Sequence, residues 1–200
     1  DKITATEVQE EILDAETVAV TPASEENSQN YHILKGELGT GTIREKCWKN
    51  ILAIETVKQL EKEQRQATKE EQNILADYVG WGGIADVFDE KKPQWQEERE
   101  RIQTALTPEE YRSAVGSVLN AHYTQPVLIK AMYQVLAGLG FTKGRILEPS
   151  CGTGNFFGLL PESMNKSTLY GVELDQMSAK IAGYLYPEVN IENTGFERTD

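Results

Sequence analysis

Residues 145–157 read Arg-Ile-Leu-Glu-Pro-Ser-Cys-Gly-Thr-Gly-Asn-Phe-Phe, and this stretch decides the fold. A short apolar strand (145–148) runs into a turn that carries Gly152 and Gly154, and a helix follows. Glycine at these two positions indicates that a ligand approaches the backbone closely, because a side chain there would collide with it. The start of the next helix offers free N–H groups. The stretch therefore predicts a ligand-binding turn at the end of a strand.

The segments around this turn alternate between helix and strand. A helix is predicted over about 125–137, and further strands over 169–173 and 189–192. Such alternation is typical of an α/β fold with a parallel, doubly wound sheet. A sheet of this kind normally has more than three strands.

The region before residue 123 has a helical pattern instead. Ile43, Cys47, Ile51 and Ile54 recur at spacings of four and three, which is one face of an amphipathic helix. Two further helix starts are marked by a capping threonine with glutamate three residues on, namely Thr68 with Glu71 and Thr107 with Glu110. We therefore divide the chain into an acidic linker or tail (1–30), a helical region (31–122) and an α/β region (123–200). One short helix is possible near residues 8–13.

The net charge of −12 is unevenly distributed. Residues 1–30 carry −7, residues 31–120 carry −3 and residues 121–200 carry −2. Outside the acidic segment the chain is near neutral, so its charge does not exclude DNA as a partner.

No apolar run reaches the ~18 residues of a membrane span, and no signal-peptide pattern opens the chain, so we expect no membrane contact. The two cysteines lie far apart, which fits a reducing cytoplasm. Because residue 1 is Asp, we expect the chain to be a piece of a longer one.

Several common site chemistries do not fit. A dinucleotide fingerprint requires a third glycine where Phe157 stands, and no phosphate-binding P-loop string occurs. The two histidines, His32 and His122, have no Cys or second His at metal-ligand spacing, so no metal is expected. Cys151 has no histidine partner that would make it a nucleophile. A glycine turn without any ligand stays open as an alternative.

The remaining pattern is an acidic residue, two variable positions and Cys-Gly-x-Gly-x-Phe. It resembles the cofactor loop of S-adenosylmethionine-dependent methyltransferases, in particular the group that methylates exocyclic amino groups of DNA bases. The resemblance implies a Rossmann-like sheet of which this chain holds the first half. It also implies that Gly152 and Gly154 admit the amino-acid portion of S-adenosylmethionine and that Glu148 accepts its ammonium. Further contacts are expected from the loop residues Ser150, Cys151, Thr153 and Phe156.

Three other positions match this family. Glu173 ends the second strand, where an acidic side chain accepts hydrogen bonds from both ribose hydroxyls, with Leu174 beside it. Tyr123 and Thr124 match an aromatic-Thr-x-Pro segment that folds over the methionine end of the cofactor. Glu197 matches an acidic residue near the adenine amino group, although Phe196 precedes it, which reverses the commoner order and leaves the register open.

The catalytic loop of amino-methyltransferases, (Asn/Asp/Ser)-Pro-Pro-aromatic, is absent, since no two of the seven prolines are adjacent. We therefore assign no catalytic residue and expect these 200 residues to be inactive alone. The helical region, with its Gly80-Trp-Gly-Gly83 string, resembles the segment before the methylase domain in very large helicase-associated proteins of phages, plasmids and conjugative elements. Trp81 is interpreted as a packed ring at a helix end. Arg44, Lys46 and Lys49 either touch phosphates or form a solvated helix face.

These resemblances predict the cofactor-binding part of a DNA adenine-N6 methyltransferase, with DNA as a partner of the parent chain. Two alternatives stay open. One is a non-catalytic methyltransferase-fold module that binds DNA or a partner, and the other is a methyltransferase for an amide nitrogen of a protein. The recognition sequence and the oligomeric state do not follow from the sequence.

Overall fold

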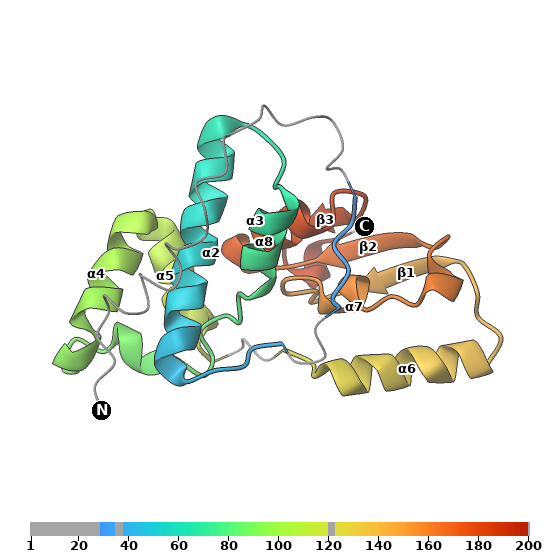
Figure 1. Ribbon diagram of the computed structural model, residues 1–200, viewed down its shortest axis with the longest axis horizontal. Coiled ribbons are helices and arrows are strands. Elements are labelled where there is room, and N and C mark those ends of the chain that lie inside the picture. The colour runs from blue at the N-terminus through green and yellow to red at the C-terminus, as the bar shows by residue number, and fades with distance from the viewer. Residues whose placement is uncertain (1–28, 35–37, 120–122, 200) are drawn as a thin grey trace.

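The structure is a computed structural model, and it describes residues 29–34, 38–119 and 123–199. Helices make up the first part, and a small parallel sheet with its helices makes up the second (Figure 1). The acidic segment lies almost wholly outside the described residues, as does the helix predicted near residues 8–13. None of the helices described has the length and hydropathy that crossing a bilayer requires.

The helices vary widely in length. The α-helices are α2 (Ile43–Glu63), α3 (Lys69–Ala76), α4 (Gln96–Ala105), α5 (Pro108–Ser117), α6 (Pro126–Gly138), α7 (Asn155–Gly158) and α8 (Gln176–Leu185). The short 3₁₀ helices are η1 (Ala85–Phe88), η2 (Pro93–Trp95), η3 (Glu162–Met164) and η4 (Phe196–Arg198).

Capping boxes start three of the helices. In each, a threonine hydroxyl accepts the N–H of the glutamate three residues on, and that glutamate accepts the N–H of the threonine. These exchanges satisfy two backbone donors that the first turn of a helix leaves without partners. The boxes are Thr42 with Glu45 at α2, Thr68 with Glu71 at α3 and Thr107 with Glu110 at α5, and the last two confirm the predictions.

The apolar face predicted for α2 is buried along most of its length. Cys47, Ile51 and Ile54 are each at most 1% exposed. Ile43, in the first turn, is 55% exposed, so the buried face begins one turn later than the sequence pattern indicated. Burial of such a face supplies most of the stability of a helix in a folded protein.

The sheet has three parallel strands in the order β1 (Arg145–Glu148), β2 (Thr168–Val172) and β3 (Asn190–Glu192). Each lies within about one residue of its predicted bounds. Glu148 is level with Gly171, and Val172 is level with Glu192, so all three strands end at the same edge. This confirms an α/β fold. In open parallel sheets, ligands bind outside the carboxyl ends of the strands.

One hydrophobic core runs through both the helices and the sheet. It extends from Cys47 and Leu60 of α2 to Ile181 of α8 and Val189 before β3. Helix α8 packs against α2, α3 and α5 on one side and against β3 on another (Figure 1). The helices before residue 119 therefore form a wall against the sheet region rather than a detached unit.

Ion pairs also connect α2, α5 and α8. The Glu110 carboxylate of α5, whose side chain is 5% exposed, lies 2.6 Å from Lys58 Nζ of α2 and 3.0 Å from Lys180 Nζ of α8. Lys180 also pairs with Glu61 of α2 at 2.7 Å. We call Lys58, Glu61, Glu110 and Lys180 the Glu110 cluster. It links three helices that are distant in the sequence.

Helix α6 lies on the other side of the sheet (Figure 1). Ile129 and Tyr133 are buried, and they pack with Leu159 and Met164. Within the described ranges β1 and β3 are the two edge strands of the sheet. The outer side of α6 is apolar and exposed, through Val127, Leu128, Met132 and Val135, and Leu139, which follows the helix, is exposed as well.

Candidate functional site

A cavity of about 500 Å³ lies at the carboxyl ends of β1 and β2, and we call it the strand-end cavity. Its volume is in the range of sites that bind small molecules. Its walls come from the turn after β1, the segment after β2, the first turn of α8, the end of α5 and the segment before α6. The predicted site residues that line it are Tyr123, Thr124, Glu148, Ser150, Cys151, Gly152, Phe156, Glu173 and Leu174.

The remaining predicted residues lie elsewhere. Thr153 and Gly154 are buried and do not line the cavity. The Glu197 side chain, in η4, is 74% exposed and lies 3.6 Å from Arg198. It does not line the cavity either, so its proposed contact stays a prediction.

The glycines of the turn are required by the chain's own aromatic rings. Gly152 has φ +55°, and a Cβ added there would lie 2.8 Å from Cε1 of Tyr123. Gly154 has φ +85°, and an added Cβ would overlap the ring of Tyr186. Both the left-handed backbone and the ring contacts exclude larger residues. The chain's own rings thus account for both glycines, and close approach of a ligand to them stays a prediction.

Glu173 is held by two backbone donors. Its Oε2 accepts the N–H of Gly152 at 2.7 Å, and its Oε1 accepts the N–H of Asp175 at 2.8 Å. Burial raises the pKa of this carboxyl, while both hydrogen bonds oppose the rise. A carboxylate has about four lone-pair directions, so two stay available to a ligand. The contact with Gly152 also ties the end of β2 to the turn after β1.

The strand-end cavity is acidic. Glu148, Glu173 and Asp175 line it, and no Lys, Arg or His does so among the described residues. Burial raises the pKa of Glu148. Burial, with Glu173 and Glu148 nearby, also raises the pKa of the Cys151 thiol to about 12, so this thiol stays protonated and unreactive at neutral pH. Such a lining favours a ligand with positive charge.

Tyr123 forms the cover of the turn. Its ring lies against Gly152, and its hydroxyl is 3.4 Å from Ser178 Oγ of α8. Burial raises the pKa of its phenol, which therefore stays neutral. Thr124 follows it in the cavity wall, before the Pro126 that starts α6. His122, in the same sequence motif, lies outside the described residues.

Sequence reasoning missed one whole wall of the cavity. Ser113, Gly116 and Ser117 reach it from α5, and Ser113 Oγ donates a hydrogen bond to Asp175 at 3.0 Å. No local pattern marks these small residues, because their position follows from how α5 packs on α8. The other lining residues missed are Tyr78, Gly80, Asn155, Asp175 and Ser178.

The cations near the start of α2 do not form a group. Arg44 pairs with Glu98 at 3.0 Å, and Lys49 pairs with Asp77 at 3.4 Å. Lys46 instead lines a second cavity beside the first. Trp81 is 1% exposed, and its ring packs edge to face with that of Phe88, with 5.1 Å between the ring centroids. This confirms its role as a packed ring.

No protein-family model matches this chain, and no solved structure matches it. Among curated proteins, the chain is similar to Defense against restriction protein B of Escherichia phage P1, with 24% identity over 131 residues. The matched stretch is 66% of this chain and 4% of the phage protein, so the chain corresponds to a small part of that relative.

Proposed function

We propose that this chain binds S-adenosylmethionine in the strand-end cavity, as the cofactor-binding part of a methyltransferase that acts on the exocyclic amine of adenine in DNA. We further propose that β1, β2 and β3 are the first half of a Rossmann-like methyltransferase sheet. The observation that carries the proposal is the placement of Glu173. It directly follows β2, lines the cavity and accepts the N–H of Gly152 in the turn after β1.

The lining suits the charge of this cofactor. S-adenosylmethionine carries a sulfonium and an ammonium against one carboxylate, so it is a net cation. Glu173 has free lone pairs that could accept the two ribose hydroxyls, and we expect Glu148, which ends β1 and lines the cavity, to accept the ammonium. Tyr123 and Thr124 close the side where the methionine portion would lie.

When bound, S-adenosylmethionine supplies an already activated methyl group. The residues of this chain would hold and orient it and would keep water away from the sulfonium. The sequence contains no Pro-Pro-aromatic loop to position the acceptor amine, so we assign methyl transfer to the parent chain. The missing loop also favours the second candidate, a non-catalytic module of the same fold.

The similarity to a phage protein named for defence against restriction supports DNA as the acceptor. Restriction acts on DNA, so the name of this relative favours DNA over protein as the partner.

Calorimetric titration of S-adenosylmethionine and S-adenosylhomocysteine tests the proposal. We expect saturable binding that Glu173→Ala weakens about tenfold or more, which corresponds to one lost pair of charge-assisted hydrogen bonds. Glu192→Ala is the matched control, because Glu192 also ends a strand but is exposed and outside the cavity. A folded chain that binds neither compound would refute the proposed cofactor site.

A further inference from the structure

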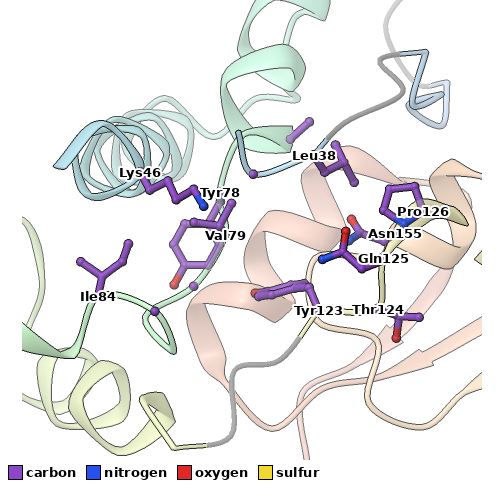
Figure 2. Close-up of a pocket in the computed structure, with 14 residues that line it drawn as sticks. Leu38, Lys46, Tyr78, Val79, Ile84, Tyr123, Thr124, Gln125, Pro126 and Asn155 are labelled. Carbon is purple, nitrogen blue, oxygen red and sulfur yellow. The ribbon is translucent and has the colours of Figure 1, made fainter. Parts of the chain in front are cut away.

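A second cavity of about 300 Å³ adjoins the first, and we call it the Gly-Trp cavity. The two share Tyr78, Gly80, Tyr123, Thr124 and Asn155 as lining residues, so the two cavities lie side by side. The Gly-Trp cavity is enclosed on one side by the Gly80-Trp-Gly-Gly83 turn and α2, and on the other by the start of α6. Figure 2 shows this arrangement.

The polar lining of the Gly-Trp cavity differs from that of the strand-end cavity. Lys46 is its one charged lining residue in the described ranges, and no carboxylate lines it there. In Figure 2 the Lys46 side chain reaches from α2 toward the open space, and the amides of Gln125 and Asn155 lie on the opposite side. The strand-end cavity is acidic and suits a cation. The adjacent Gly-Trp cavity suits an anion that also carries hydrogen-bonding groups.

A buried hydrogen-bond pair fixes the glycine-rich wall. Asn50 of α2 is fully buried, its amide nitrogen donates to the Gly80 carbonyl at 2.7 Å, and its amide oxygen accepts the Val79 N–H at 2.8 Å. The wall is therefore held against the helix that carries Lys46. This gives the Gly-Trp-Gly-Gly string a role beyond packing Trp81.

We propose that the Gly-Trp cavity binds one nucleotide of DNA, the methyl acceptor, with its phosphate at Lys46 and its base near Gln125 and Asn155. The inference rests on the proposed function and adds the acceptor site to it. Side-chain amides form paired hydrogen bonds with adenine edges, and an ammonium is a common phosphate contact. A cavity of about 300 Å³ is on the scale of one nucleotide, so we expect the base to enter it unpaired or flipped out of a duplex.

Fluorescence anisotropy of a short single-stranded DNA containing one adenine, with S-adenosylhomocysteine present, tests this inference. Lys46→Gln should weaken DNA binding about tenfold and lower the salt slope by about 0.7, the value for one phosphate contact on a single strand. Lys62→Gln, an exposed cation in the last turn of the same helix, controls for long-range charge and should change binding little.

A steric variant provides a second, independent test. An added Cβ at Gly83 would meet nothing within 4 Å, so Gly83→Phe should fill the cavity without disturbing the fold. Gly138→Phe, at the end of α6 and outside both cavities, is the matched control. We expect Gly83→Phe to abolish DNA binding and to retain S-adenosylhomocysteine binding.

Calorimetry with S-adenosylhomocysteine on each variant separates the two proposals. Retained cofactor binding with DNA binding that is unaffected by Lys46→Gln and Gly83→Phe would overturn the acceptor site alone. If the unaltered chain does not bind S-adenosylhomocysteine, the proposed function is refuted instead. Deoxyadenosine monophosphate that binds as tightly as the DNA would overturn DNA as the source of the nucleotide.

Discussion

Replacement of Glu110 by Gln tests the joint between α5, α2 and α8. Burial would raise the pKa of this carboxyl, but hydrogen bonds from Lys58, the Thr107 N–H and Lys180 lower it from 4.5 to about 2. At about 1.4 kcal/mol per pH unit, this shift corresponds to roughly 3 kcal/mol of stability at neutral pH. Lys58 and Lys180 are about a quarter exposed and keep part of their hydration, so we expect Glu110→Gln to cost about 2 kcal/mol.

The pH dependence has a definite sign. A carboxyl whose folded pKa is depressed contributes stability above its unfolded pKa, and loses it as the pH falls through the folded value. The difference between the unaltered chain and Glu110→Gln should therefore be full above about pH 5 and should shrink toward zero near pH 2. Urea unfolding followed by tryptophan fluorescence at several pH values measures it.

Glu109→Gln is the matched control for this experiment. Glu109 lies in the same first turn of α5 and feels the same helix dipole, but it is exposed and its side chain is outside the Glu110 cluster. Gln at position 110 still accepts the Thr107 N–H in the capping box. If both variants unfold at the same urea concentration at pH 7, or if the difference persists at pH 2, the reasoning about the cluster is wrong.

Three further outcomes are expected. A Cβ added at Gly116 would meet nothing within 4 Å, so Gly116→Leu should fill the strand-end cavity. We expect this variant to show no S-adenosylhomocysteine binding in calorimetry. Its melting temperature should be no lower than that of the unaltered chain, because glycine disfavours helix. S-adenosylhomocysteine affinity should fall as the pH is lowered from neutral, and the fall should begin at a higher pH than for ordinary carboxyl groups because burial raises the pKa of Glu148 and Glu173. The fall should be shallower in Glu173→Gln. Asn50→Ala should lower stability by about 2–4 kcal/mol in urea unfolding, since it leaves the Val79 N–H and the Gly80 carbonyl without partners.

The elements could be predicted where the signal is local. The capping boxes at Thr68 and Thr107 need only residues three apart, and the structure confirms both. β1 and β2 have short apolar stretches in their middle, β3 has the single apolar residue Ile191, and the structure gives all three within about one residue of the predicted bounds. The carboxyl-end placement of Glu148 and Glu173 then follows from parallel pairing.

The walls of the site could not be predicted in the same way. Ser113 and Gly116 face the strand-end cavity because α5 is held on α8, partly through Glu110 and Lys180. That pairing joins residues far apart in sequence and leaves no periodic signal. The separation of Arg44 and Lys49 from Lys46 has the same origin, since their partners lie in later segments.

The ring contacts of the two turn glycines bear on how ligand binding would work. The ring over Gly152 comes from the segment before α6, and the ring over Gly154 comes from Tyr186, just after α8. The turn is thus shaped by contacts that form when the chain folds, and Glu173 is already fixed on it by the Gly152 N–H. A site ordered by folding leaves little conformational entropy to be lost on binding. The same contacts explain why the glycine pattern is required whether or not a ligand is bound, so the pattern alone locates the turn, and the acidic lining and Glu173 point to what it binds.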